Sequence, residues 1–324
     1  MTEQTNAHFL TDIEIKEFKC FTDFKTSGFK RVNLIGGKNN VGKTAFMEAC
    51  FINVHSENIN TMVTAIYGIK QIREKTNLIF GEINPQKLLD ATSAYTSKSN
   101  LRLSNKEFSI VEKDAVKEYK FNINGEKKTI NARELSLNFS AIYNIKIIDS
   151  VGWNDIALVK VYQAIQKKDK ENELNIFVRE FDRSIENFKV IGDKPQCKTN
   201  GEYRDITEFG DGLKHYISII CALYACENGY LFIDEIDNGI YYDHLDRLWE
   251  IILTLSKQNN CQVFATTHSQ EMLESFARVA KKLDEQDISY TLLLKDKQQE
   301  IKTISFDYEM LLDSIEQKRE VRGW

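Results

Sequence analysis

The stretch "LIGGKNNVGKTAFMEACF", residues 34–51, decides how the rest of the chain is interpreted. Gly37, four further residues, then Gly42, Lys43 and Thr44 match the spacing G-x-x-x-x-G-K-[ST]. An apolar strand pattern precedes this spacing and a helical pattern follows it, which is the context in which it holds a polyphosphate. We therefore expect an α/β fold of the P-loop class.

The expected loop has a chemical task for each type of residue. Its glycines let backbone N–H groups wrap the phosphates, and the helix N-terminus favours their negative charge. Lys43 is expected to reach the terminal phosphates, and the Thr44 hydroxyl to ligate Mg²⁺. The loop positions assigned to nucleotide binding are Gly37, Asn39, Asn40, Gly42, Lys43, Thr44 and Ala45.

A second motif lies in "GYLFIDEIDNG", residues 229–239. Four apolar residues run into Asp234 and Glu235, so a buried strand would carry two carboxylates at its C-terminal end, where open α/β sheets bind ligands. We expect Asp234 to hold Mg²⁺ directly or through water, and Glu235 to polarise the attacking water. Two carboxylates at the end of a buried strand cost folding free energy unless a ligand or a partner compensates their charge.

Two further motifs follow from strand and helix ends. "ATTHS", residues 265–269, ends the next strand, and His268 there is a candidate contact for a γ-phosphate. "EFGDGLKHYISII", residues 208–220, places Gly210, Asp211 and Gly212 before a helix, and we call these three residues the signature loop. A glycine-rich helix start is an anion-binding element, although Asp211 is equally compatible with a helix N-cap.

The order of elements predicts the architecture. The last third alternates strands and helices, which favours a largely parallel sheet flanked by helices. Residues 101–135 read as antiparallel strands with a hairpin turn at Asn124-Gly125, and residues 155–188 as two helices. We expect one domain over 1–324, in which 52–200 is an inserted β-hairpin and helical lobe.

Composition narrows the class of protein. The chain has 324 residues, of which 42% are hydrophobic, enough for a sizeable core. No apolar run approaches the roughly 18 residues that span a bilayer, and the first ten residues do not resemble an export signal. The six scattered cysteines predict neither a disulfide nor a structural metal. We expect a cytoplasmic protein without a membrane partner; the formal charge of -5 does not decide whether it binds DNA.

Taken together, five segments resemble one family: "EFKCF", "GGKNNVGKT", "EFGDGLKHYISII", "YLFIDEIDNGIYYDHLDRLWEII" and "QVFATTHSQEMLESF". They are similar to the ABC-class ATPases of the OLD (overcoming lysogenisation defect) group, and more distantly to RecF and SMC-type heads. The resemblance implies two ATPs sandwiched between two copies of the chain. It places Lys43, Thr44, Asp234 and Glu235 in cis, the signature loop in trans, and His268 as the switch residue. Lys19 resembles the basic residue that reaches ATP in related heads.

The sequence departs from that family in several places. The signature is "FGDG" and not of the Ser-Gly-Gly type, and "YNIKIIDS", residues 143–150, lacks the glutamine expected of a Q-loop. Heptad repeats for coiled coils are missing. The residues after His268 lack the spaced acidic motifs of a TOPRIM nuclease, so any effector is expected to be a separate polypeptide.

The leading hypothesis is an ATP-driven switch that closes as a dimer or higher homo-oligomer. By analogy it would control a separately encoded nuclease or toxin in bacterial anti-phage defence, with DNA or a phage protein as the trigger. The alternative is a RecF-like repair ATPase that clamps DNA. A membrane-transporter subunit fits less well, because the signature and the segment between residues 51 and 200 differ from those proteins. No residue distinguishes ATP from GTP.

Overall fold

The computed structural model describes residues 8–73, 100–113, 116–130 and 144–317. Within these ranges the expected motifs lie on one six-stranded sheet, which we call the motif sheet, of order β15-β14-β3-β13-β12-β8. In that order the strands span Ile301–Phe306, Ile288–Lys295, Val32–Gly36, Gln262–Thr266, Tyr230–Ile233 and Ile145–Ile148. β15 is antiparallel to β14 and the other pairs are parallel. The predicted α/β fold with a mixed, largely parallel sheet is confirmed.

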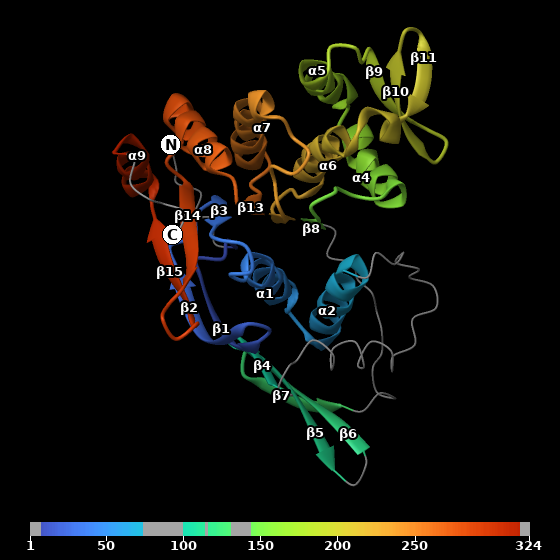
Figure 1. The fold of residues 1–324 in the computed structure, drawn as a ribbon. Helices are drawn as coiled ribbons and strands as arrows, with labels where there is room; N and C mark the ends of the chain where they lie inside the picture. Colours follow the sequence, from blue (N-terminus) through green and yellow to red (C-terminus); the bar gives the residue numbers. More distant parts are fainter. Residues whose placement is uncertain (1–7, 74–99, 114–115, 131–143, 318–324) are drawn as a thin grey trace, which may run out of the picture.

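Helices cover both faces of the motif sheet (Figure 1). Consecutive strand residues point to opposite faces, so Leu34 joins the apolar core beneath the later helices, while Ile35 joins a second core with the two early helices. Phe232 likewise packs with the early helices, and its neighbours Leu231 and Ile233 with the later ones. The early helices are α1 (Lys43–His55) and α2 (Ile59–Arg73), and the later ones α6 (Asp211–Ala225), α7 (Leu245–Gln258), α8 (Gln270–Leu283) and α9 (Tyr308–Glu316).

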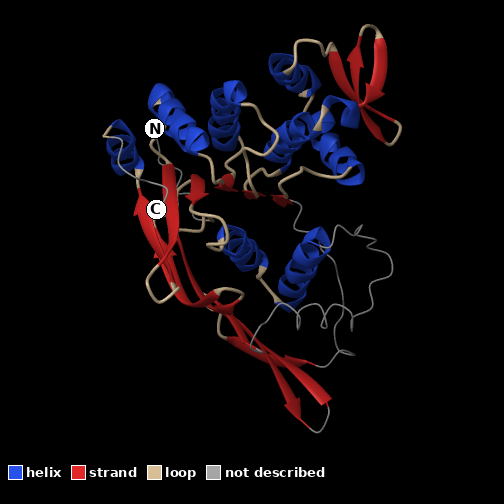
Figure 2. Cartoon of the chain, viewed as in Figure 1, coloured by secondary structure: helices blue, strands red, loops and turns tan. Residues whose placement is uncertain are grey.

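A second, fully antiparallel sheet has the order β2-β1-β4-β5-β6-β7 and extends away from the motif sheet (Figure 2). Its strands span, in that order, Phe21–Ser27, Asp12–Phe18, Asn100–Leu103, Lys106–Lys113, Val116–Ile123 and Glu126–Ile130. Asn124 (φ 55°) and Gly125 (φ 92°) form the predicted hairpin turn. The part of the expected strands beyond residue 130 lies outside the described residues. The sequence also favours helix over 58–90, and the part of that range beyond residue 73 lies outside them too.

A third unit carries the two predicted helices, α4 (Asp155–Lys167) and α5 (Glu171–Phe181). A three-stranded sheet follows them, formed by β9 (Asn187–Ile191), β10 (Lys194–Thr199) and β11 (Glu202–Asp205). These strands and β2 were not predicted, because their polar residues interrupt the apolar alternation. The stretch 52–200 therefore contributes strands to all three sheets.

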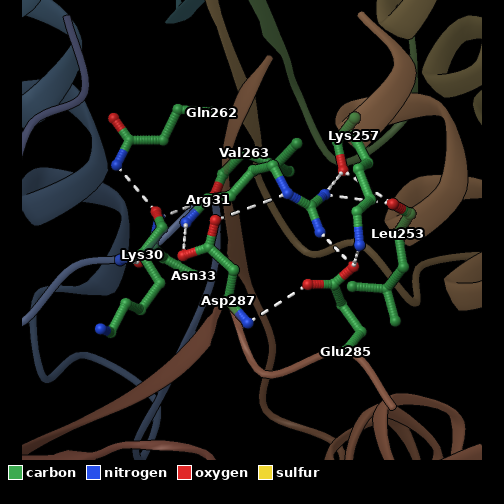
Figure 3. Close-up of polar contacts among 10 residues, drawn as sticks. Lys30, Arg31, Asn33, Leu253, Lys257, Gln262, Val263, Glu285 and Asp287 are labelled. Carbon is green, nitrogen blue, oxygen red and sulfur yellow. Dashed lines mark hydrogen bonds and ion pairs between the residues drawn. The ribbon is translucent and has the colours of Figure 1, made fainter. Parts of the chain in front are cut away.

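The amino edge of the motif sheet holds a buried charge network around Arg31, the residue before β3 (Figure 3). Its guanidinium donates to the Leu253 carbonyl (3.1 Å) and to the Ser256 hydroxyl, and pairs with the Glu285 carboxylate at 2.8 Å. Lys257 adds a second cation at 3.0 Å from Glu285. Burial alone would raise the pKa of Glu285, but these two cations hold that pKa below its ordinary value. The network ties β3, α7 and the segment before β14 together.

No helix in the described parts of the chain is long and apolar enough to cross a membrane. Five of the six cysteines are buried, and Cys20 alone is exposed. Burial raises the pKa of the Cys197 thiol to about 12, which keeps that sulfur protonated and unreactive at neutral pH.

Candidate nucleotide site

The phosphate loop joins β3 to α1 and depends on two glycines. Gly37 (φ 138°) and Gly42 (φ 105°) adopt conformations that side chains disfavour. A Cβ on Gly37 would lie 2.4 Å from the Leu293 carbonyl oxygen, and one on Gly42 would lie 2.8 Å from the Cys20 sulfur. No side chain caps the start of α1. The first amides of that helix therefore point into a glycine-walled loop, as an anion-binding helix start requires.

Lys43 lies back over the loop that it follows. Its ammonium donates to the carbonyls of Gly37 (2.8 Å) and Lys38 (3.1 Å), which leaves one of its three N–H bonds for a phosphate oxygen. Burial lowers the pKa of Lys43, and the nearby carboxylates of Glu235 and Asp234 oppose that shift. A triphosphate would supply the negative charge that this half-desolvated ammonium lacks.

Asp234 follows β12 and reaches across β13 toward the phosphate loop. One carboxylate oxygen accepts hydrogen bonds from the hydroxyls of Thr44 (3.1 Å) and Thr266 (2.7 Å). Asp234 is 9% exposed. A buried carboxylate beside a threonine hydroxyl forms the hard oxygen donor set that Mg²⁺ prefers, so the two residues fit the metal role expected of them.

Glu235 and His268 lie at the same carboxyl edge. Glu235 is left-handed (φ 49°), and its backbone N–H donates to the Thr266 hydroxyl at 2.8 Å. A non-glycine residue in this region is strained, and such strain concentrates at functional positions. His268 is exposed just beyond β13, between Thr267, which donates to Asp237 at 2.6 Å, and Ser269, which caps α8. The residues on both sides of His268 are held by hydrogen bonds, and the imidazole is exposed to solvent at this edge.

Asp149, which was not among the expected site residues, lies beside Asp234. β8 runs parallel to β12 with Ile148 beside Ile233, so Asp149 leaves its strand next to Asp234. Both carboxylates line one pocket, together with Thr44, Met47, Glu48, Ile69, Ile72, Arg73, Ile147, Ile148 and Ser150. The sequence contained a signal for this: "KIIDS" repeats the pattern of "LFIDE", an apolar strand that ends in an aspartate. The aspartate lies where a Q-loop glutamine was sought.

Lys19 lies near this pocket, but its partner is a protein carboxylate. Its ammonium pairs with Glu48, which is 1% exposed and also accepts from Arg73 at 2.7 Å. Glu48 lies one helical turn after Thr44 on α1. The two cations neutralise a buried acid beside the expected metal position, so contact between Lys19 and the nucleotide stays a prediction.

The signature loop lies at the start of α6. Gly210 (φ 86°) is the N-cap residue, so Asp211 is not the cap, and no side chain caps this helix. A Cβ on Gly210 would meet nothing within 4 Å, whereas one on Gly212 would lie 1.8 Å from the Gly239 carbonyl oxygen. Gly212 is therefore required by packing within the chain, and Gly210 leaves open space in front of an uncapped helix start.

Buried contacts connect this helix start to the loop that follows Asp234 and Glu235, two residues that we call the acid pair. His215 on α6 contacts the Asn238 carbonyl oxygen through Nδ1 (3.1 Å), and the Asn238 amide donates to the Ser150 carbonyl (2.7 Å). A Cβ on Gly152 would come within 3.0 Å of His215 Cα. Burial lowers the pKa of His215, so the imidazole is neutral at physiological pH. The loops after β8 and β12 are therefore packed and hydrogen-bonded to the start of α6.

The sheet order, the phosphate loop and the acid pair define an α/β P-loop ATPase. Comparison with protein families agrees, because the AAA ATPase domain family matches residues 52–273. The chain belongs to that family. An "ATP/GTP phosphatase" of Helicobacter pylori is 27% identical over 331 residues, which cover 85% of this chain and 89% of the relative.

Solved structures show the same fold. An SMC head bound to the C-terminal winged-helix domain of ScpA aligns with a TM-score of 0.54 at 13% identity, covering 93% of this chain and 99% of that one. An SMC head with an extended coiled coil, bound to the C-terminal domain of ScpA from Pyrococcus furiosus, aligns with a TM-score of 0.50 at 12% identity, covering 96% and 100%. At these identities the likeness concerns the fold.

Proposed function

We propose that this chain binds and hydrolyses ATP with Mg²⁺ and works as a nucleotide-dependent dimerisation switch. The observation that carries the proposal is the open, uncapped start of α6 at Gly210. The cis elements are assembled within one chain, whereas this second anion-binding helix start has open space before it. A phosphate bound to another copy would satisfy its free amides.

Within one copy, the residues divide the work of phosphoryl transfer. The phosphate loop and Lys43 position the triphosphate, and Thr44 and Asp234 would hold the metal. Bound Mg²⁺ would neutralise charge that develops on the β- and γ-phosphates. Glu235 would accept a proton from the attacking water, and the hydrogen bond from its backbone N–H to the Thr266 hydroxyl holds its backbone in place. His268 would contact the γ-phosphate from the neighbouring strand end.

The second copy would complete the site through Gly210, Asp211 and Gly212. The contacts at His215 and Gly239 support this division, because they place the signature loop against the segment that follows Glu235. ATP binding would close the pair, and hydrolysis would reopen it, so the two states differ in affinity for a partner. We further propose that the chain is related to the OLD group, controls a separately encoded effector and acts in anti-phage defence.

The test uses the molar mass of the Glu235→Gln protein in solution, with and without ATP. We expect a mass of one chain without ATP and of two or more with ATP, because ATP is held but not cleaved. Lys43→Ala in the same background should stay at one chain. A Glu235→Gln protein that hydrolyses ATP at the parent rate contradicts the general-base role.

The DNA-clamp alternative makes a different prediction in the same assay. A clamp would retain plain duplex DNA only with ATP, and that retention would weaken steeply as salt rises. Retention of DNA by the closed Glu235→Gln assembly would favour the clamp, whereas closure without DNA binding favours the switch.

A further inference from the structure

His215 is a fully buried histidine on α6, three residues after Gly212 of the signature loop. It is 0% exposed, and its Nδ1 lies 3.1 Å from the Asn238 carbonyl oxygen. A carbonyl oxygen only accepts, so Nδ1 carries the hydrogen of the neutral ring and Nε2 carries none. Nε2 is buried without a hydrogen-bond partner among the described residues. The surroundings of the ring therefore select one tautomer, the Nδ1–H form.

The acceptor of this hydrogen bond belongs to a loop that is fixed on two further sides. Asn238 lies three residues after the acid pair, and its side-chain amide donates to the Ser150 carbonyl at 2.7 Å. The preceding residue, Asp237, accepts a hydrogen bond from the Thr267 hydroxyl at 2.6 Å, and Thr267 precedes His268. The Nδ1–H bond thus connects the start of α6 to the ends of β8, β12 and β13, where the expected site residues lie.

Packing alone does not account for an imidazole at this position. A buried polar nitrogen without a partner destabilises the folded state, so an apolar side chain of similar size would be more favourable if it only filled space. Unpaired buried polar atoms are rare in native structures and call for a specific reason. The reason that the contacts of His215 supply is the directed hydrogen bond from its other nitrogen to Asn238.

Charged groups lie on each element packed around the ring. Asp237, in the loop after β12, raises the pKa of His215, but burial lowers that pKa by more. Lys214 on the same helix pairs with Asp155 at the start of α4 at 2.7 Å, and Asp149 begins the loop after β8. A proton on Nε2 would create a buried N–H without an acceptor in the described parts of the chain. The neutral ring is therefore the form that these contacts accommodate.

We propose that His215 is a positioning residue whose Nδ1–H holds the signature loop against the loop after the acid pair, so that ATP-dependent pairing of two copies requires the neutral Nδ1–H imidazole. The inference rests on the proposed function and extends it, since it names a residue that acts through the start of α6 and not through contact with the nucleotide. The phosphate loop, which binds the nucleotide in the same copy, is left unchanged.

Two amide substitutions test which nitrogen matters. An asparagine side chain places its amide nitrogen near the position of Nδ1, whereas glutamine places it near that of Nε2. In the Glu235→Gln background, His215→Asn should keep the dissociation constant of the ATP-bound dimer close to that of the parent. His215→Gln should raise it about tenfold, the equivalent of one lost hydrogen bond. Affinity of the single chain for a fluorescent ATP analogue should stay the same in both variants.

A pH series on the Glu235→Gln protein provides a test that needs no change at His215. Because burial holds the pKa of His215 below its ordinary value of 6.5, the dimer should weaken as the pH falls through that lowered pKa. His215→Asn should lack this loss, while every other titrating group is the same in the two proteins. His244→Asn is the matched control: it removes a half-buried histidine that stacks on Phe181 and should keep the loss.

Urea unfolding of the same variants separates positioning from packing. If His215→Asn and His215→Gln weaken the dimer equally, in step with their loss of stability, His215 only fills space and the proposal is overturned. A His215→Asn protein with the parent's pH dependence also overturns it, and neither result touches the dimerisation switch. A Glu235→Gln parent that stays a single chain with ATP overturns the switch and this proposal together.

Discussion

The two edges of the motif sheet place buried charge in opposite ways, and the same five-residue strand, β3, connects them. At the amino edge, Arg31 is 3% exposed and meets carboxylate, hydroxyl and carbonyl partners from two other elements. At the carboxyl edge, Asp234 and Lys43 are also mostly buried, but their partners are neutral hydroxyls and carbonyls. Charges at the first edge form direct ion pairs, whereas Lys43 and Asp234 at the second edge hydrogen-bond to neutral groups of the described residues. Buried charge therefore stabilises the fold where the chain supplies an ion-pair partner, and we expect it to bind a ligand where the chain does not.

The largest effect should come from Arg31→Met. It leaves Glu285 and Lys257 without their central partner, and breaking a buried ion network typically costs about 3–5 kcal/mol. The free energy of unfolding, measured in urea, should fall by that order, while the folded fraction keeps its affinity for ATP. If the folded Arg31→Met protein also lost affinity for ATP, the two edges would not have separate roles in stability and in binding. Adding Glu285→Gln should recover part of the stability.

Lys43→Ala, at the carboxyl edge, should have the opposite effect: ATP affinity should fall while stability is kept. Removing a charged partner from a bound phosphate costs on the order of 2–5 kcal/mol of binding free energy, so affinity for an ATP analogue should drop at least about thirtyfold. The midpoint of urea unfolding without nucleotide should stay the same or rise, because a partly desolvated ammonium is removed. Titration calorimetry and urea unfolding on one preparation measure both.

Gly212→Ala tests the contact between the start of α6 and the loop after β12. The new Cβ would meet backbone at 1.8 Å, so we expect a loss of about 1–3 kcal/mol in stability, as for overpacking, and weaker ATP-dependent dimerisation. Gly68 on α2 has open space and an ordinary φ, so Gly68→Ala should stabilise by about 0.5–1 kcal/mol and leave the dimer unchanged. Equal behaviour of the two variants would rule out a special role for that contact.

Asp149→Asn should have a smaller effect, confined to the metal. If its carboxylate helps Asp234 to hold Mg²⁺, the Mg²⁺ concentration that half-saturates ATP binding should rise about tenfold, or about 1.4 kcal/mol. Asp155→Asn removes a surface partner of Lys214 and serves as the control. An unchanged Mg²⁺ requirement would leave Asp149 as a purely structural strand end.

The smallest effect is a pH dependence at the amino edge. Because the pKa of Glu285 is lowered in the folded state, its stabilising contribution is present above the unfolded pKa of about 4.3 and is lost as pH falls through the folded value. The parent should therefore lose stability faster than Glu285→Gln below that pH. Parallel stability curves for the two proteins would show that the network contributes no acid sensitivity.

Prediction from the sequence succeeded where a motif is local. The strand, loop and helix around Lys43, and the strand that ends before Asp234, are confirmed as elements, because apolar runs and glycines specify them within about ten residues. Asp149 was missed because only the pairing of β8 with β12 places it beside Asp234. The strands β9 to β11 were missed because their polar sequences pack against helices and acquire their pattern from that contact.

The amino-acid sequence by itself determined the class of fold and pointed to Lys43, Thr44, Asp234 and Glu235 as candidate site residues, since phosphate-loop geometry depends on local φ angles and strand ends that neighbouring residues dictate. Only the tertiary structure decided what Gly212, His215, Glu48 and Asp149 do. Their roles come from contacts across 20 or more residues, including Gly212 against Gly239, His215 against Asn238 and Glu48 against Lys19 and Arg73. Contacts of that range arise from packing of separate elements, and no periodicity in the chain records them.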